Sequence, residues 1–175
     1  MMGRLRAMRE PLKYVQGRDA LLKFHEEMGY MGKRWLFVCS NSGYKACHDK
    51  IEKSFEGLDD YRRYEIFGGI SSNGEINKMK AIVEQDNIDT VVAVGGGSAV
   101  DTAKATAYYS GKHIVIVPTV AATDAPCTGL SVIYNDDHSF DKYLFYPTNP
   151  DAVMVDTTVI ANAPVTVSYT HLRAH

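Results

Sequence analysis

The sequence feature that most constrains the fold is the stretch from Thr90 to Ala105, which reads TVVAVGGGSAVDTAKA. It begins with a run of mostly β-branched apolar residues, which is typical of a parallel strand buried on both faces. Three glycines at 95–97 follow at once, and Ser98 opens a segment of good helix formers that runs to about Tyr109. A strand, a glycine turn and a helix in this order present backbone N–H groups beside a helix N-terminus, which suits the phosphates of a nucleotide.

The same stretch also has an interpretation that needs no ligand. Glycines make tight turns, and Ser98 with Asp101 three residues later fits a capping pattern at the start of a helix. The stretch is not a Walker A motif, because no Lys-Ser/Thr pair follows the glycines at the required distance. It is not G-x-G-x-x-G either, because Ser98 and Asp101 stand where that pattern has a later glycine. Taken alone, the stretch leaves a phosphate site and a plain turn open.

The bulk properties exclude several classes of protein. A length of 175 residues suggests one domain with enough chain for a hydrophobic core, and 45% hydrophobic with 23% charged residues is typical of a folded globular chain. The formal net charge of -2 gives no sign of a nucleic-acid or membrane partner, and no apolar run approaches the roughly 20 residues that span a bilayer. Three cysteines without C-x-x-C spacing support neither a disulfide framework nor a zinc knuckle, so we expect a reducing cytoplasm.

Segments with strand and helix patterns alternate along the chain. Short apolar or β-branched runs predict strands over 13–17, 35–39, 61–67, 90–94, 113–117 and 152–156. Helices are predicted over 19–28 and 44–55, from the capping box at 72–75 through 83, and over 98–109. A hairpin is predicted from 130–134 and 142–146. Because this alternation implies parallel βαβ units, the expected fold is α/β, a doubly wound, mostly parallel Rossmann-like sheet with a β-hairpin.

Three loops fall where such a sheet binds its ligands. In doubly wound sheets the ligand lies beyond the carboxyl ends of the strands. The loops Ser40–Gly43, Gly95–Ser98 and Thr119–Thr128 each follow one of the predicted strands. Loops that meet at one sheet edge form a crevice, so their combination favours a nucleotide site over a plain turn.

The last residues have a different character from the rest. They follow Ala163-Pro164 without a clear period. His171 and His175 have the i, i+4 spacing of two metal ligands on one helix face. We favour a terminal tail as the interpretation, because no third ligand accompanies the two histidines.

Several of these segments closely resemble the glycerol dehydrogenases of the iron-containing (group III) alcohol dehydrogenase superfamily. The resemblance lies in Gly95–Lys104, Pro118–Cys127 and Leu130–Tyr134, and it extends to Lys13–Gly17 and Asn149–Asp156. These motifs follow one another in the family's order, and together they cover about residues 9–164. The related dehydroquinate synthases carry a different sequence after the glycines.

The resemblance implies the cofactor-binding domain of an enzyme that oxidises a small polyol, glycerol to dihydroxyacetone, with NAD and a divalent metal, usually zinc. The domain would cover 1–164, and 165–175 would be an unrelated tail, for which a non-native origin is one reading. The family's helical C-terminal domain, which supplies most metal ligands, is missing, so we expect no metal site and no activity in this chain alone. The rival hypothesis is a non-catalytic nucleotide-binding module. NADP as cofactor and a homo-oligomeric full-length enzyme remain open.

The resemblance also implies roles for individual residues. The pyrophosphate region would be held by Gly95, Gly96, Gly97, Ser98 and Asp101. The nicotinamide half would be surrounded by Thr119, Ala122, Thr128, Leu130 and Tyr134. Asp124 would contact the substrate, and a carboxylate can accept hydrogen bonds from two vicinal hydroxyls. The alternative for Asp124 is a loop residue that caps its own backbone.

Ser40 departs from the family pattern. An acidic residue at a strand end binds the ribose 2′-hydroxyl of NAD and repels the 2′-phosphate of NADP. The resemblance places the family's Asp at Ser40, which carries no repelling charge, while Ser42 and Lys45 lie close in sequence. We therefore predict a cofactor contact from Ser40 and weak discrimination against NADP, unless Ser40 only caps the following helix.

Overall fold

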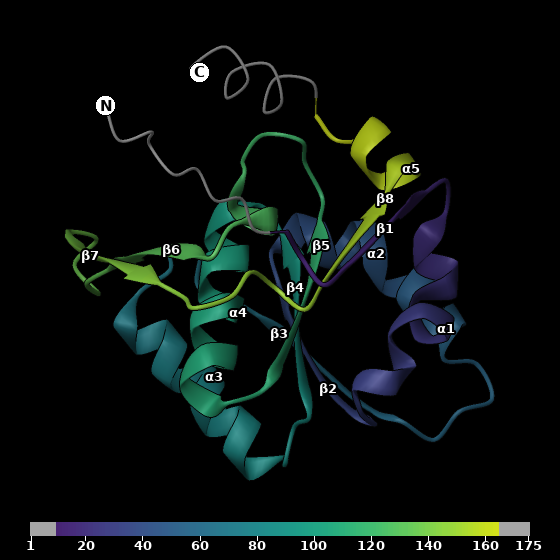
Figure 1. Ribbon diagram of the computed structural model, residues 1–175, viewed down its shortest axis with the longest axis horizontal. Helices are drawn as coiled ribbons and strands as arrows, with labels where there is room; N and C mark the ends of the chain where they lie inside the picture. Colours follow the sequence, from purple (N-terminus) through teal and green to yellow (C-terminus); the bar gives the residue numbers. More distant parts are fainter. Residues whose placement is uncertain (1–9, 165–175) are drawn as a thin grey trace, which may run out of the picture.

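The computed structural model describes residues 10–164, which form an α/β fold (Figure 1). A six-stranded parallel sheet has the order β1-β8-β5-β4-β2-β3, and a separate antiparallel pair joins β6 and β7. The strands of the large sheet are β1 (Lys13–Gly17), β2 (Arg34–Cys39), β3 (Tyr61–Ile66), β4 (Thr90–Gly95), β5 (His113–Pro118) and β8 (Ala152–Asp156). The hairpin strands are β6 (Leu130–Tyr134) and β7 (Phe140–Phe145). The helices are α1 (Phe24–Met28), α2 (Asn41–Ser54), α3 (Asn73–Gln85), α4 (Gly97–Ser110) and α5 (Thr157–Ala161).

The predicted doubly wound sheet with a hairpin is confirmed. All pairings within the large sheet are parallel, and every predicted strand is present with its ends shifted by at most two residues. The strand β4 lies between β2 and β5, with Val94 opposite both Cys39 and Val117. The carboxyl ends of these three strands therefore lie level with one another, which brings together the loops that follow them.

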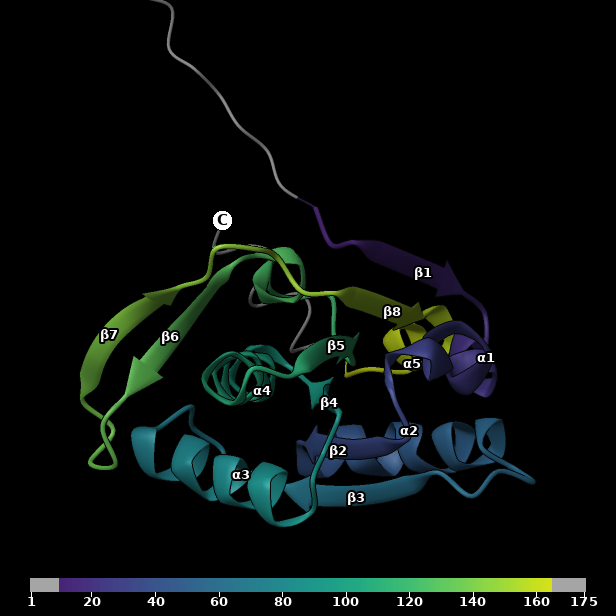
Figure 2. The same cartoon turned by 60° about the horizontal axis from the view of Figure 1, so that its bottom comes forward.

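The alternation of side chains along each strand builds a core on both faces of the sheet. Trp35 and Phe37 of β2 point to the face covered by α1 and α2, where they pack with Phe24 and Phe55. Leu36 and Val38 point to the opposite face, which α3 and α4 cover. Figure 2 shows these helices on the two sides of the curved sheet. Because both faces are covered, the inner strand β4 is buried along its whole length, whereas the edge strand β3 carries charged residues.

The helix α4 is unusual because it is buried all round its axis. Every residue from Ala99 to Ala107 is buried, since the helix lies between the large sheet, α3 and the hairpin (Figure 2). Five of these nine residues are alanine or valine, and such short side chains allow neighbouring elements to approach closely. A helix in this position cannot expose a charged side chain to water, so its two charged residues need partners inside the protein.

The predicted helix over 19–28 is only partly correct. Leu21, Phe24 and Met28 are buried as the spacing indicates, but the segment is divided into a 3-10 turn (Ala20–Lys23), the short α1 and a second 3-10 turn (Gly29–Met31). Asp19 has a left-handed backbone with φ of 53°, so the chain enters the segment from a tight turn. The apolar spacing therefore predicted correctly which residues are buried, but it did not predict that the segment is broken into short helical turns.

The capping predictions had different outcomes. Ser72 accepts a hydrogen bond from the Glu75 N–H at 3.2 Å and caps α3, as predicted. The capping alternative for Ser98 is wrong, because α4 begins at Gly97 with Gly96 as its N-cap. Ser40–Gly43 is not a simple break, because Ser40 caps α2 and the helix begins at Asn41.

Some sequence features lie outside the described residues. These are the tail over 165–175 and its two histidines, His171 and His175. Within residues 10–164, none of the helices combines the length and the apolar character that crossing a membrane requires.

Candidate functional site

The three predicted loops meet at the carboxyl edge of the sheet. The Ser40 N–H donates to the Val94 carbonyl at 3.0 Å, which joins the end of β2 to the end of β4. The Thr119 N–H donates to the Gly95 carbonyl at 3.1 Å, which joins the end of β5 to the glycine loop. Backbone hydrogen bonds of this kind fix the loops independently of their side chains, so the crevice is built into the fold.

The glycines of this edge divide into two kinds. A Cβ on Gly95 would stand 2.8 Å from the Ala99 Cβ and 3.0 Å from the Ser40 Oγ, so Gly95 allows the helix and the loop to pack closely. A Cβ on Gly96 or Gly97 would meet nothing nearer than 3.7 Å. These two glycines are not required by packing, and they leave open space beside the backbone.

The first turn of α4 offers free hydrogen-bond donors beside that space. The N–H groups of Gly97, Ser98 and Ala99 have no hydrogen-bond partner within residues 10–164, and the first intrahelical bond comes from the Val100 N–H to the Gly96 carbonyl. A helix of 14 residues adds a partial positive charge at the same place. The arrangement fits an anionic group such as a pyrophosphate.

The loop 119–128 carries Asp124 to the same edge. Asp124 is exposed, and its carboxylate makes no hydrogen bond or ion pair within residues 10–164. It lines a hollow of about 650 Å³ above β5 and β8, together with Thr123, Val120 and Thr128. Thr123 lies over the glycine loop, with its Oγ1 3.7 Å from the position of a Cβ on Gly97. The carboxylate is therefore free to bind a ligand in this hollow.

The residues that the sequence assigned to the nicotinamide half do not all lie together. Thr119 and Ala122 are nearly buried at the start of the loop, and Thr128 and Leu130 lie where the loop enters β6. Tyr134 lies at the far end of β6, where its N–H donates to the Ser71 carbonyl at 2.9 Å. No contact within residues 10–164 joins Tyr134 to the glycine loop, so its assignment to the cofactor stays a prediction.

Asp101 points away from the tip of the glycine loop. Its Oδ2 accepts a hydrogen bond from the Val132 N–H at 3.2 Å, and its Oδ1 lies 3.3 Å from the Lys104 Nζ. Burial raises the pKa of this carboxyl. The observed partners of Asp101 therefore belong to the hairpin and to α4, and a direct contact with the pyrophosphate stays a prediction.

The sequence analysis missed Lys104 as a functional candidate. It is 3% exposed, and its Nζ donates to carbonyl oxygens of the loop that carries Asp124. A signal was present, because Lys104 stands among alanines and threonines in a helix without a polar face. A lysine in such a helix must find acceptors inside the protein. Val120 and Thr123, which lie over Gly96 and Gly97, were missed because a single sequence does not show loop geometry.

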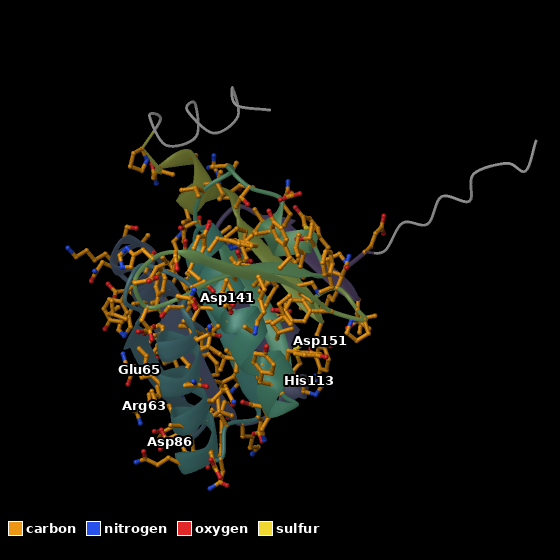
Figure 3. All side chains as sticks on the ribbon, turned by 90° about the vertical axis from the view of Figure 1, so that its left-hand side faces the viewer. Arg63, Glu65, Asp86, His113, Asp141 and Asp151 are labelled. Carbon is orange, nitrogen blue, oxygen red and sulfur yellow. The ribbon has the colours of Figure 1, made fainter. Side chains whose placement is uncertain are left out.

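A second hollow lies at the opposite edge of the sheet. Its volume is about 870 Å³, and it borders the amino ends of β4, β5 and β8. Figure 3 shows Asp151 beside His113 at this edge, where the Asp151 Oδ2 is 3.4 Å from the His113 Nδ1. The same view shows Arg63 and Glu65 near Asp86, an ion-pair group on the edge strand β3. None of these groups faces the glycine loop.

No metal site is found in the part of the chain that the structure describes. Among residues 10–164, no three or more His, Cys, Asp or Glu side chains are placed to hold one ion. The three cysteines Cys39, Cys47 and Cys127 are free. The site as described therefore offers backbone donors and one free carboxylate, without ligands for a metal.

Comparisons with known proteins agree with this geometry. A family model for iron-containing alcohol dehydrogenases matches residues 11–157. The chain is 40% identical over 159 residues to a glycerol dehydrogenase of Escherichia coli O6:H1, covering 91% of this chain and 43% of that protein. It is 42% identical over 161 residues to a glycerol dehydrogenase of Thermotoga maritima, covering 88% of this chain and 42% of that protein.

A solved structure gives the same result. The crystal structure of a probable glycerol dehydrogenase from Sinorhizobium meliloti 1021 matches with a TM-score of 0.83 and 36% identity, over 93% of this chain and 44% of that one. The chain thus spans less than half the length of the relatives it matches.

Proposed function

This chain belongs to the iron-containing alcohol dehydrogenase family, and we propose that it is the cofactor-binding part of an NAD-dependent polyol dehydrogenase. One observation carries the proposal. The free N–H groups at the start of α4 and the loop that carries the free carboxylate of Asp124 lie at the same carboxyl edge of the sheet, where the Thr119 N–H donates to the Gly95 carbonyl and Thr123 lies over Gly97. An anion cradle beside a carboxylate suits a dinucleotide whose nicotinamide end meets a polyol.

The residues of this chain have distinct roles in the proposed reaction. When bound, NAD would supply the acceptor for the hydride of the carbinol carbon, and loss of the hydroxyl proton to solvent would complete the oxidation of the polyol to a ketone. Gly96, Gly97 and Ser98 hold the pyrophosphate through their backbone. Asp124 accepts hydrogen bonds from two hydroxyls of the substrate, which fixes the carbon chain relative to the nicotinamide. Glycerol is the substrate that we propose, with dihydroxyacetone as product.

The proposed enzyme also uses a divalent metal, and zinc is the metal that the resemblance favours. Residues 10–164 do not fit a metal, because they bring together no three suitable side chains. In the proposal the metal ligands come from a part of the enzyme beyond these residues. We therefore expect the 175-residue chain to oxidise no polyol, with or without added zinc. The free cysteines support a cytoplasmic enzyme.

Cofactor binding by the chain itself tests the first part of the proposal. NADH titrated into the chain should bind, and Gly96→Ala should weaken binding by at least about tenfold, because a methyl group occupies the space beside the free donors. The control is Gly17→Ala, whose added Cβ meets nothing within 4 Å. If Gly96→Ala and Gly17→Ala bind NADH as the wild type does, the glycine loop is not the pyrophosphate site.

Turnover by the complete enzyme tests the second part. Asp124→Asn should lower kcat/KM for glycerol by about 10- to 100-fold while NADH affinity stays within about twofold, because only the substrate hydroxyls lose the charge. A complete protein that binds NADH and never oxidises a polyol would instead be a non-catalytic nucleotide-binding module.

A further inference from the structure

Lys104 is a buried charge in the middle of α4. Its side chain is 2% exposed, and the alanines and threonines around it in the helix are buried too. An isolated ammonium group in such surroundings is strongly disfavoured, and burial lowers the pKa of Lys104. Specific hydrogen-bond or ion-pair partners must therefore stabilise the Lys104 side chain inside the protein.

Those partners belong to one loop. The Lys104 Nζ donates to the carbonyls of Ala125 at 2.9 Å and Thr128 at 3.3 Å, and also to the carbonyl of Leu130. An ammonium group has three N–H donors, which equals the number of carbonyl acceptors here. A neutral amine has only two donors, so the geometry favours the charged form.

Asp101 completes the arrangement one turn earlier in the helix. Its Oδ1 faces the ammonium at 3.3 Å, and its Oδ2 accepts from the Val132 N–H. The Asp101 carbonyl accepts from the Ser131 Oγ at 3.2 Å, and Ser131 in turn accepts from the Tyr146 hydroxyl at 2.8 Å. The Asp101–Lys104 pair thus joins α4 to the loop before β6 and to β6 itself.

The loop over 120–128 makes few other hydrogen bonds to the rest of the described protein. Within 120–128 the remaining backbone hydrogen bonds are local, such as the Cys127 N–H to the Asp124 carbonyl at 3.0 Å. From outside, the Asn149 Nδ2 donates to the Cys127 carbonyl at 2.8 Å, and the Tyr146 N–H donates to the Gly129 carbonyl at 2.8 Å. Asp124 itself is exposed without a partner of its own. The position of the carboxylate therefore depends on how the carbonyls that follow it, from Ala125 to Leu130, are held.

We propose that Lys104, balanced by Asp101, is a positioning residue that fixes the loop 123–130 and thereby the place of Asp124 at the crevice. The inference rests on the proposed function, in which Asp124 meets the substrate and Thr128 and Leu130 meet the nicotinamide. Neither residue of the pair needs to touch the cofactor for this role. The pair holds the nicotinamide side of the crevice, while the glycine loop holds the pyrophosphate side.

A double variant of the chain tests the positioning role. Lys104→Met removes all three donors, and Asp101→Asn in the same molecule avoids an unpaired buried carboxylate while keeping an acceptor for the Val132 N–H. Amide hydrogen exchange in 123–130 should rise by about tenfold or more, while exchange in β4 and the first turn of α4 stays unchanged. The matched control is Thr106→Val, a buried position on α4 whose hydroxyl bonds only to the Thr102 carbonyl at 2.8 Å.

Binding of two ligands, ADP-ribose and NADH, distinguishes a positioning role of the pair from a general loss of structure. The reference is Asp101→Asn alone, which accounts for any contact of Asp101 with the pyrophosphate. Relative to it, the affinity of the double variant for ADP-ribose, which lacks the nicotinamide, should stay within about twofold, whereas NADH affinity should fall by about tenfold. Unchanged exchange in the loop, or an equal loss of affinity for both ligands, would overturn the inference. If the wild type binds neither ligand, the proposed function fails, and the exchange experiment still decides whether Lys104 holds the loop.

A second variant covers the case in which the double variant does not fold. Lys104→Arg keeps the charge, and the hollow of about 870 Å³ that Lys104 borders has room for the longer side chain. A planar guanidinium cannot match three carbonyls arranged for an ammonium, so loop exchange should rise by a smaller factor, about threefold. In the complete enzyme this variant should lower kcat for glycerol with ADP-ribose affinity unchanged. Wild-type exchange and wild-type kcat in Lys104→Arg would contradict the proposal.

Discussion

Aspartates at the amino edge of the sheet and Asp124 at its carboxyl edge differ in their partners. At the amino edge, the Asp89 Oδ2 accepts from the N–H groups of Lys33 at 2.9 Å and Arg34 at 3.0 Å. There too the Asp151 Oδ2 accepts from the Ile114 N–H at 2.9 Å. At the carboxyl edge, the Asp124 carboxylate and the N–H groups of 97–99 have no partner within residues 10–164. Asp156 at the end of β8 also satisfies backbone N–H groups, those of Leu21, Thr158 and Val159. The contrast therefore lies between Asp89 and Asp151, which bind the chain's own backbone, and Asp124, which remains available to a ligand.

This difference shows which observation identifies a site. The amino edge has the larger hollow, about 870 Å³ against about 650 Å³ beside Asp124. Size alone would therefore select the amino edge and not the carboxyl edge at which we propose the site. A polar group that is already paired inside the protein contributes to stability and has little left to offer a ligand, whereas an unpaired donor or acceptor at a concave edge gains a partner when the ligand binds.

The largest effect on stability is expected from Gly43→Ala at the carboxyl edge. A Cβ at Gly43 would stand 2.5 Å from the Val94 carbonyl oxygen and 3.0 Å from its carbon. Alanine favours a helix by up to about 1 kcal/mol over glycine, but overpacking against rigid backbone costs about 1–3 kcal/mol or more. We expect a net loss of about 2 kcal/mol in the free energy of unfolding, measured by urea denaturation.

Gly97→Ala is the matched control for this prediction. It also lies in the first turn of a helix, but its Cβ would have no neighbour nearer than 3.7 Å. The free energy of unfolding should stay within about 0.5 kcal/mol of the wild type or rise slightly. If Gly43→Ala and Gly97→Ala were equally stable, close packing would not explain the presence of glycine at 43, and the distinction between closely packed and open glycines at this edge would be wrong.

A smaller effect is expected from Asp89→Ala at the amino edge. The change leaves the N–H groups of Lys33 and Arg34 without their acceptor, so we expect a loss of about 1–2 kcal/mol in the free energy of unfolding. NADH affinity should not change, because Asp89 lies at the opposite edge from the glycine loop. Asp89→Asn, which keeps an oxygen acceptor, should lose less. If Asp89→Ala lowered NADH affinity and left the free energy of unfolding unchanged, the amino edge would bind the cofactor, contrary to the proposal.

Apolar runs predicted the strands well because a strand covered on both faces leaves a strong pattern in the sequence. The run at 90–94 became the buried strand β4, and the capping box at Ser72 became the observed start of α3. The meeting of three loops followed from topology alone, since the carboxyl ends of parallel strands share one edge. These parts of the fold depend on local pattern and chain order.

The parts that failed depend on contacts between distant segments. Serine is a favoured N-cap residue, which makes Ser98 a candidate, but the helix starts earlier, with Gly96 as its N-cap and Gly97 in its first turn. The role of Lys104 required knowing that carbonyls 21 to 26 residues later lie against the helix. A single sequence does not show such contacts between distant segments. The residues around Asp124 could therefore be predicted to form a loop, but the contacts that hold this loop in place could not be predicted.

The smallest effect concerns the adenosine end of the crevice. Ser40 follows β2, its Oγ accepts from the Gly43 N–H at 3.0 Å, and it packs under Gly95. The capping role is therefore present, and a cofactor contact is compatible with it because Ser40 remains partly exposed beside the glycine loop. Ser42 and Lys45 are exposed in the same part of α2, where they can approach a 2′-phosphate.

Ser40→Asp tests this contact without removing the cap, because aspartate is as good an N-cap as serine. In the wild type, NADP should bind within about tenfold of NAD, since no charge repels the 2′-phosphate. The variant should weaken NADP binding by a further factor of about five to ten, the effect expected of like charges separated by a few ångströms of water-exposed space. Titration of both cofactors against the two proteins measures the change. If the wild type already rejects NADP as strongly as Ser40→Asp does, another group reads the ribose, and the carboxyl edge selects its cofactor elsewhere.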